Sequence, residues 1–413
     1  MLAVIAFILL VYLYSLFSRR LEGTVFTIPL IFSGFGIVLF LAIPGLIRRD
    51  VASPVWLMLA ELTYAIVLLN GATRVDLRVL RGQMQLPGRL LVIGLPLTIL
   101  CGMIAAVLVF PGLSWGEAGV LACLLASTDT GLAERIVTSK RVPACIREAL
   151  NAESGLSDGL VVPFLMLFVS LLRAETAGPG LLFLRMAVQQ IVYGILIGAI
   201  IGFAGGWLLG VARRRGWASA PFQQIALIAL APLCWVLSRV VYTSPFIAAF
   251  AAGIAVQISF REAAEGIVEF SENEGRLLNM FVFFLFGTAA GEALSEFELA
   301  PVLYALLSLT LVRLLPVAMS MIGTRLSAAS VLFMGWFGPR GLACIVLGLV
   351  VAGQDVRTAG ASLLRIGLIA TVLLSIVAHS FTAAPGIKLY ARQLTRLDPS
   401  APEFEAASGM QTT

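Results

Sequence analysis

The stretch ALNAESGLSDGLVVPFLMLFVSLL, residues 149–172, combines a membrane-length apolar run with two carboxyl groups. From Gly159 onward the residues suit a membrane-spanning helix, whereas Glu153 and Asp158 stand in its first half with no basic residue beside them. An ionised side chain at the middle of a bilayer costs about 2.5–3.5 kcal/mol, so such residues are expected to line a protected interior. The stretch therefore predicts a membrane-crossing helix that carries a polar functional site.

The composition of the whole chain agrees with this prediction. Of its 413 residues, 60% are hydrophobic and only 12% are charged, which is typical of a polytopic membrane protein and not of a water-soluble domain. Apolar runs long enough to cross a bilayer recur about thirteen times along the chain. We therefore expect an all-α polytopic membrane protein of about thirteen transmembrane helices.

The basic residues predict the orientation in the membrane. One set of loops collects 19 of the 28 lysines and arginines, and the positive-inside rule places that set in the cytoplasm. We expect a multi-pass protein of the cell membrane (inner or plasma membrane), with its N-terminus outside, its C-terminus cytoplasmic and its first apolar run retained as a span. The net charge of +5 then reflects topology, and no nucleic-acid partner is expected.

The rare residue types argue against an enzyme. The single histidine, His379, cannot form a multi-histidine metal site, and a structural role for it is favoured over a proton relay. No nucleophile elbow, phosphate-binding loop or dinucleotide fingerprint is present in the sequence. We expect no catalytic residues and no cofactor, only the bilayer and small ions as partners.

Two of the expected spans contain residues that interrupt a helix. Thr128 and Asp129 lie in the apolar run ASTDTG, where short polar side chains favour local backbone bonds over the helical ladder. Pro339 and Arg340 lie in GWFGPRG, where proline removes a helical hydrogen bond. Each break falls in the fifth span of one half of the chain, a pattern typical of transporters built from inverted repeats with two interrupted crossing helices.

Helical spacing sorts the polar residues of the opening stretch into two tasks. Ser154 and Asp158 are four residues apart and share a face, so with Asp129 and the carbonyls freed near Thr128 they offer only oxygen ligands. Such ligands suit a monovalent cation or, on a carboxylate, a proton. Glu61, in another span, is a further candidate at the same cavity.

Glu153 is predicted to neutralise Arg340, because a buried charge without a partner is far more costly than an ion pair. The alternative is that all of these acids only pair with Arg313 and Arg340 to hold helices together. The acids outnumber the two arginines within spans, so at least one carboxyl group remains to bind an ion or a proton.

Three motifs resemble those of monovalent cation:proton antiporters, in particular the NhaP-like sodium/proton branch. AESGLSDGLVVPF resembles the family's E-S-x-x-N-D helix, ASTDT resembles its T-D-P break, and GWFGPRGLA resembles its arginine-bearing helix. The resemblance implies that Asp158 binds the ion and the proton and that Glu153 pairs with Arg340. It further implies that the ion is held with the help of Asp129, Ser154, the Thr128 carbonyl and, as a further candidate, Glu61.

The resemblance covers essentially all spans and implies a division of the chain. An antiporter domain would occupy residues 1–386, with a core bundle around 90–172 and 299–383 and a dimerisation scaffold around 1–70 and 183–292. Residues 387–413 would form a short cytoplasmic tail, and the protein would be a homodimer in which the core bundle moves against the scaffold.

The chain departs from the family's pattern at two positions. Ser157 stands where the family has asparagine, a position tied to ion preference and to electroneutral or electrogenic exchange, and Thr130 replaces the proline. We expect Ser157 to modulate an electroneutral exchange of Na⁺ for protons by alternating access, with K⁺ as the other candidate cation. The alternatives are an ion-coupled solute symporter and a channel-like cation pathway.

Overall fold

The computed structural model describes residues 2–21, 24–43, 54–73, 85–177, 180–260, 263–353, 359–398 and 400–404, and no strand is present within these ranges. The helices, in chain order, are α1 Leu2–Leu21, α2 Ile28–Ala42, α3 Pro54–Thr73, α5 Gln85–Arg89, the π-helix η1 Leu90–Gly94, α6 Leu95–Val109, α7 Trp115–Leu124, α8 Thr130–Val137, α9 Ala144–Ala177, α10 Gly180–Arg214, α11 Ala220–Val240, α12 Pro245–Ser259, α13 Ala263–Ala293, the 3₁₀ helix η2 Leu294–Glu296, α14 Leu299–Leu309, α15 Leu311–Ser320, α16 Ala328–Trp336, α17 Leu342–Gly353, α18 Ala361–Leu394 and the 3₁₀ helix η3 Pro402–Phe404.

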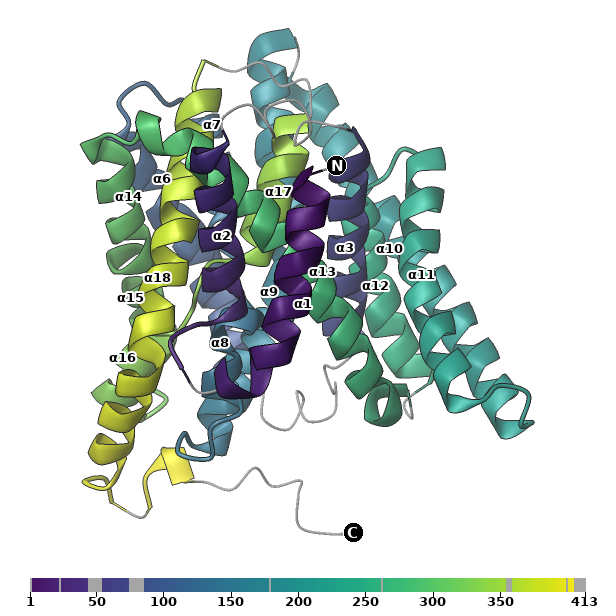
Figure 1. Ribbon diagram of the computed structural model, residues 1–413. Coiled ribbons are helices and arrows are strands. Elements are labelled where there is room, and N and C mark those ends of the chain that lie inside the picture. Colours follow the sequence, from purple (N-terminus) through teal and green to yellow (C-terminus); the bar gives the residue numbers. More distant parts are fainter. Residues whose placement is uncertain are drawn as a thin grey trace.

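The lengths and apolar character of these helices suit a membrane. Eight helical segments of the described chain have the length and composition to cross a bilayer, and five shorter apolar helices lie among them. The all-helical membrane architecture predicted from composition is confirmed, while the number of about thirteen crossings stays a prediction. Figure 1 shows the helices packed side by side, and a helix is the structure expected where every backbone polar group must be satisfied within its own segment.

Both predicted helix breaks are present. α7 ends at Leu124, and α8 begins at Thr130 after Asp129, whose side chain accepts a hydrogen bond from the Gly131 backbone nitrogen as an N-cap. α16 ends at Trp336, and α17 begins at Leu342 after the segment that contains Pro339. The first helix stops because hydroxyl and carboxyl side chains form local hydrogen bonds with the backbone. The second stops because proline removes a helical hydrogen bond.

The close contacts of α10 with α12 and of α13 with α2 depend on small residues. A Cβ placed on Gly198 or Gly202 of α10 would overlap the backbone of α12 at Ala248 or Ala252. These glycines are four residues apart, the spacing that lets two membrane helices approach closely. A Cβ on Gly287 of α13 would likewise overlap the backbone of α2. The missing side chains of these glycines therefore allow the two helices of each pair to pack closely.

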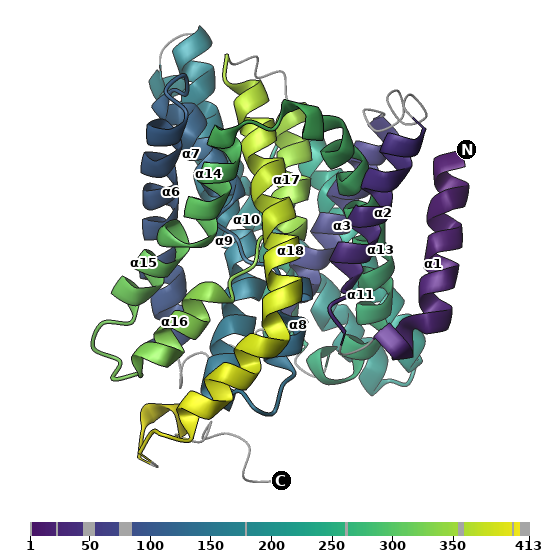
Figure 2. The same cartoon turned by 60° about the vertical axis from the view of Figure 1, so that its left-hand side comes forward.

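The helices form two packed groups, which meet where α9, α17 and α18 contact α3, α12 and α13. One group contains α2, α3, α11, α12 and α13, and the other contains α6, α7, α14, α15, α16 and α18. Figure 2 shows α1 at the outer edge of the first group, where Phe7 packs against Phe32, Phe281 and Phe284. The broken helices and α9 lie in or beside the second group.

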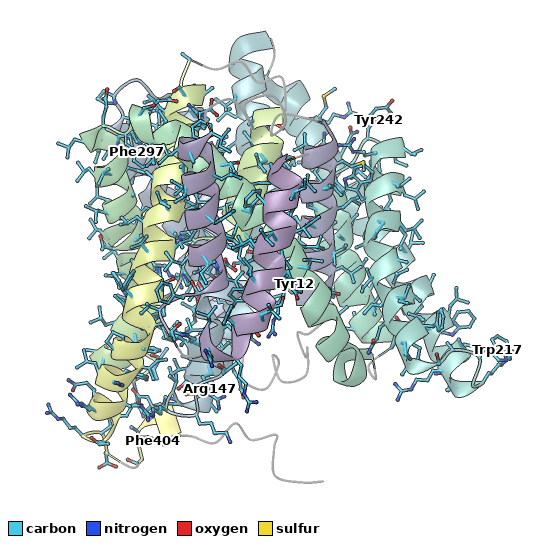
Figure 3. All side chains as sticks on the ribbon, viewed as in Figure 1. Tyr12, Arg147, Trp217, Tyr242, Phe297 and Phe404 are labelled. Carbon is cyan, nitrogen blue, oxygen red and sulfur yellow. The ribbon has the colours of Figure 1, made fainter. Side chains whose placement is uncertain are left out.

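The last described residues pack onto the start of α16. Glu403 is 2% exposed, and its Oε1 accepts hydrogen bonds from the Ser327 backbone nitrogen at 2.8 Å and from Ser330 Oγ at 2.7 Å. The Cys145 thiol, at the start of α9, donates to the Glu403 carbonyl. Figure 3 places Arg147 and Phe404 at this end of the molecule, with Phe297 and Tyr242 at the opposite end. α18 continues to Leu394, so the predicted tail begins as helix, and residues 405–413 of that tail lie outside the described ranges.

Candidate functional site: the crossing of two broken helices

Asp129 joins the two helix breaks. Its Oδ1 accepts a hydrogen bond from the Gly131 nitrogen at 2.9 Å, and its Oδ2 accepts one from the Leu342 nitrogen at 3.2 Å. Its own backbone nitrogen donates to the Pro339 carbonyl at 2.8 Å. The carboxylate therefore lies at the positive N-terminal ends of both α8 and α17, where a negative charge is favoured. Gly341 makes this possible, because a Cβ there would overlap Asp129 Oδ2.

Arg340 lies at the C-terminal end of α7, on the other side of the first break from α8. The residue is fully buried, and its Nη1 donates to the carbonyls of Ala126 at 2.7 Å and Ser127 at 2.8 Å. These carbonyls follow the C-terminal end of α7, which carries partial negative charge. Its backbone nitrogen donates to Ser375 Oγ of α18 at 2.7 Å. An acid in one break and a base in the other thus compensate the helix ends that the breaks expose.

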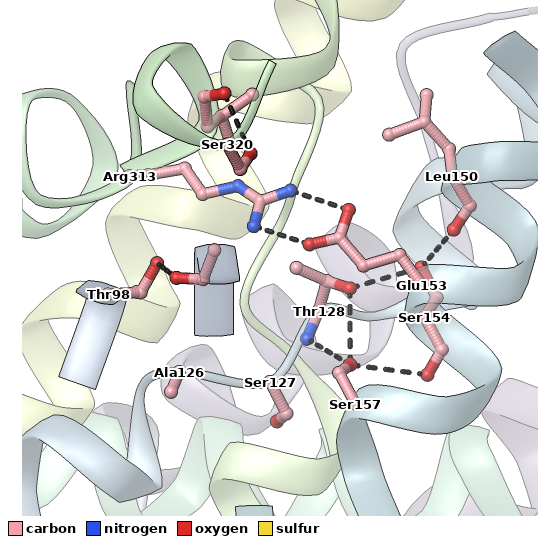
Figure 4. Close-up of polar contacts among 12 residues, drawn as sticks. Thr98, Ala126, Ser127, Thr128, Leu150, Glu153, Ser154, Ser157, Arg313 and Ser320 are labelled. Atoms are coloured by element: carbon pink, nitrogen blue, oxygen red, sulfur yellow. Dashed lines mark hydrogen bonds and ion pairs between the residues drawn. The ribbon is translucent and has the colours of Figure 1, made fainter. Parts of the chain in front are cut away.

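Glu153 pairs with Arg313 and not with the predicted partner Arg340. Two parallel hydrogen bonds join them, from Nη1 to Oε1 at 2.5 Å and from Nη2 to Oε2 at 2.7 Å, with both side chains at most 4% exposed (Figure 4). Arg313 reaches the carboxylate through the space beside Gly338, where a Cβ would overlap its guanidinium. Arg340 is directed to the carbonyls after α7 instead. The prediction therefore named the wrong arginine as the partner of Glu153.

Three hydroxyl groups line the space between the first break and α9. Thr128 Oγ1 donates to Ser154 Oγ at 3.2 Å, and Ser154 Oγ donates to the Leu150 carbonyl at 3.0 Å. Ser157 Oγ accepts from the Thr128 backbone nitrogen at 3.3 Å. Figure 4 shows these groups beside the ion pair of Glu153. The structure therefore brings the predicted site residues Thr128 and Ser154 together, and it adds Ser157, which the sequence placed on the adjacent face of the helix, to the same cluster.

Asp158 has an oxygen with no partner. Its Oδ1 is buried and makes no hydrogen bond to any residue of the described ranges, an unusual state for a carboxylate oxygen. Its backbone carbonyl accepts a hydrogen bond from the Tyr64 hydroxyl of α3 at 3.1 Å. Asp158 lies one helical turn beyond Ser154 on the same face of α9, so the unpartnered oxygen belongs to the same region as the hydroxyl groups.

Glu61 lies in a different set of contacts. Its Oε2 accepts hydrogen bonds from Arg239 Nη2 at 2.8 Å and from Trp235 Nε1 at 2.9 Å, both on α11. The Arg239 guanidinium also stacks over the Trp235 ring. The structure therefore connects α3 to α11 through Glu61, and no described contact brings its carboxylate to Asp158.

Tyr64 was not predicted from the sequence, Arg313 was considered only in the alternative in which the acids merely hold helices together, and His379 has the structural role that the sequence favoured. Tyr64 contacts the backbone of Asp158, and Arg313 is the ion-pair partner of Glu153. His379 has both ring nitrogens at backbone carbonyls, Nδ1 at Ser375 and Nε2 at Trp336, each at 2.8 Å. Arg313 carried a usable signal, because it is one of only two basic residues inside the predicted spans.

Comparison with known proteins adds a family to this geometry. The family model described as "Sodium/hydrogen exchanger, transmembrane" matches residues 5–388. A probable Na⁺/H⁺ antiporter of Schizosaccharomyces pombe is 30% identical over 152 residues, which are 35% of this chain and 20% of that protein. A K⁺/H⁺ antiporter NhaP of Alkalimonas amylolytica is 24% identical over 298 residues, which are 71% of this chain and 50% of that protein.

A solved structure has the same fold. The sodium proton antiporter MjNhaP1 from Methanocaldococcus jannaschii superposes with a TM-score of 0.74 at 21% identity, covering 92% of this chain and 99% of that chain. In contrast, this chain spans half or less of the length of the curated relatives it matches.

Proposed function

Because the chain belongs to the transmembrane sodium/hydrogen exchanger family, we propose that it exchanges a monovalent cation for protons across a membrane by alternating access. The observation that carries this proposal is the buried Asp158 Oδ1, which has no partner within the described chain and lies beside a helix break lined by hydroxyl groups. An unpartnered buried carboxylate oxygen is costly unless a proton or a cation binds it.

The exchange follows from competition for one carboxylate. Asp158 holds either a proton or the cation, and only the occupied site changes its exposure from one side of the membrane to the other. Ser154, the Thr128 carbonyl and Asp129 supply further oxygen ligands for the cation. Both Asp129 oxygens already accept backbone hydrogen bonds, but a carboxylate oxygen has a second lone pair with which to bind an ion.

Glu61, Glu153 and Ser157 have less direct roles in this proposal. Glu61 supplies negative charge near the pathway, and it binds the cation itself only after it releases Arg239. Glu153 holds Arg313 and keeps α9 and α15 in register. Ser157 modulates the hydroxyl cluster. Because it carries no charge, it adds no second carboxyl group that could bind a proton, and the proposed exchange is one cation for one proton.

Na⁺ is the proposed cation, and K⁺ is the other candidate. Relatives of this chain bear the names of Na⁺/H⁺ and of K⁺/H⁺ antiporters, and oxygen-only ligands suit either ion. A solute symporter would require an additional organic-substrate pocket, and a channel would pass cations without moving protons. We propose neither, and neither do we propose an enzyme or a bound cofactor.

The two packed groups of helices supply the moving parts. The group with the broken helices and α9 is proposed to be the core bundle, and the group of α2, α3, α11, α12 and α13 the dimerisation scaffold of a homodimer. The excess of basic loop residues supports a cell-membrane protein with its N-terminus outside and its C-terminus in the cytoplasm.

A vesicle assay tests the function. Purified protein in proteoliposomes with an imposed pH gradient is exposed to Li⁺, Na⁺, K⁺ and Rb⁺ in turn, with choline as the control cation. We expect Na⁺ to collapse the gradient. If no cation does so in vesicles that hold the gradient without protein, antiport is refuted.

The stoichiometry is tested with the same vesicles clamped at different membrane potentials. An electroneutral exchange proceeds at a rate that does not depend on voltage, in the wild type and in Ser157→Asn. A rate that rises steeply with voltage means that net charge crosses the membrane, and the one-for-one exchange is then excluded.

A further inference from the structure

Two polar side chains of α13 reach α8 near the crossing of the broken helices. Arg276 Nη2 of α13 binds Glu134 Oε1 of α8 at 2.9 Å, and both side chains are about half exposed. Asn279 lies one helical turn farther along α13, and Gly131 lies one turn nearer the break on α8. Asn279 therefore faces the region between the exposed ion pair and the Asp129 carboxylate.

The immediate surroundings of Gly131 are polar. A Cβ built on Gly131 would have three nearest heavy atoms, namely Asp129 Oδ1 at 3.3 Å, Asn279 Nδ2 at 3.9 Å and Asp129 Cγ at 4.0 Å. The first distance is a close contact and the other two are ordinary van der Waals contacts, so the Asp129 carboxylate and the Asn279 amide both lie directly beside Gly131. The amide comes from α13, which packs with the group of helices that does not contain the breaks.

Asn279 has hydrogen-bonding capacity that the described chain does not use. Its Oδ1 is buried and has no partner within the described ranges. As placed, the amide nitrogen faces Gly131, and a half-turn of the amide exchanges the two atoms and brings the oxygen to that position. An amide oxygen is a neutral, hard ligand that can replace one water of a cation's hydration shell.

We propose that Asn279 is a cation ligand at an intermediate site, called the waypoint. This site lies between Asp129 and the end of the protein where Arg276 and Glu134 form their ion pair. This inference rests on the proposed function and adds to it a residue from the scaffold. Because Asn279 and Asp129 belong to different groups of helices, the waypoint is complete only when the core bundle stands at this end. Asn279 carries no titratable proton, so it acts on the cation and not on the competing proton.

Two measurements test the proposal on the full-length purified protein. The first is exchange in proteoliposomes, which gives the apparent KM for Na⁺ and K⁺ and the pH profile at saturating cation. The second is the shift in melting temperature that Li⁺, Na⁺ or K⁺ produces relative to choline, since a ligand that binds only the folded state raises its stability. The variants are Asn279→Ala and Asn279→Asp, with Thr288→Val as a control on the same helix, because the Thr288 hydroxyl donates to the Leu285 carbonyl of its own helix.

We expect Asn279→Ala to raise the KM for the cation about five- to tenfold, as for a lost neutral hydrogen-bonding ligand, with an unchanged pH profile and a smaller cation-dependent melting shift. Asn279→Asp adds a carboxylate, so it lowers the KM and moves the pH profile. Thr288→Val should change neither.

Other outcomes overturn the proposal. An unchanged KM and melting shift in both Asn279 variants excludes a cation ligand, and so does an equal loss of rate at every cation concentration, which indicates a structural role. If the wild type does not exchange ions but shows a cation-dependent melting shift that Asn279→Ala removes, the antiport proposal fails and the ligand assignment stands.

Discussion

The two helix breaks interrupt their spans over equal lengths, residues 125–129 and 337–341, but they differ in chemistry. The first contains hydroxyl groups and a carboxylate, and it faces α9 with its unpartnered Asp158 oxygen. The second contains Pro339, Arg340 and two glycines, and it packs against the first. The difference agrees with the proposal that the first break binds ions and the second supports it. Loss of exchange and loss of stability should therefore be separable by mutation.

The largest effect is expected at the ion-binding side. Asp158→Asn keeps the size of the side chain but removes the charge for which the cation and proton compete. Exchange should fall to background, about 100-fold or more, while the melting temperature stays close to that of the wild type. Cation-dependent proton release in proteoliposomes measures it, with Asp398→Asn, an exposed carboxylate outside the spans, as the control. Exchange at the wild-type rate would show that the proposed ion-binding residue is another one.

The next effect concerns the ion pair that supports the site. Arg313→Met leaves the Glu153 carboxylate buried without its partner, which should lower the free energy of unfolding by about 3–5 kcal/mol. The double variant Glu153→Met with Arg313→Met should recover much of the loss, because neither charge remains. Unfolding in detergent measures both. A double variant no more stable than the single one would contradict the pairing.

A smaller loss of stability is expected at the second break. Arg340→Met removes two hydrogen bonds to carbonyls at the end of α7, but it also removes a buried charge that is costly to desolvate, so we expect the free energy of unfolding to fall by about 1.5–3 kcal/mol in total. No carboxylate substitution should rescue this variant, since its partners are backbone groups. Rescue by Glu153→Met would mean that Arg340 depends on that carboxylate after all.

The smallest effect is expected at the start of α16, the helix that ends at the second break. Burial raises the pKa of Glu403, but hydrogen bonds from the Ser327 nitrogen and the Ser330 hydroxyl outweigh it and hold the pKa below its ordinary value. The ionised form therefore stabilises the fold above the ordinary pKa of 4.5, and this contribution is lost as the pH falls through the lower folded-state pKa.

Glu403→Gln should consequently lower the free energy of unfolding at pH 7 by about 1 kcal/mol, with a smaller difference in acid. Melting temperatures at neutral and acidic pH measure this change. A difference that grows in acid would show that the Glu403 carboxylate is not held in its charged form by these contacts.

The sequence was sufficient for the features that depend on local chemistry. Polar residues in ASTDTG and the proline of GWFGPRG predict where the helices stop, and helical spacing places Ser154 and Asp158 on one face. Both predictions need only neighbours along the chain, and residues near in sequence cannot be far apart in space.

The sequence was not sufficient for the choice among distant partners. Arg313 and Arg340 both lie within expected spans, and only the packed structure shows which one the Glu153 carboxylate meets. Glu61 bonds to Arg239, and Asn279 faces Gly131, through contacts between helices far apart in the chain. A pattern of residues contains no distances between helices, so these contacts have no signal in a single sequence.

The contact between the two breaks also has a consequence for how the protein is made. Asp129 and Leu342, which bond across the crossing, are 213 positions apart. At a synthesis rate of about 5–20 residues per second, the first break waits about 10–40 s in the membrane before its partner leaves the ribosome. During that interval the Asp129 charge and the α7 carbonyls lack the groups that later neutralise them. The first half of the chain therefore cannot reach its final packing until the second half is inserted.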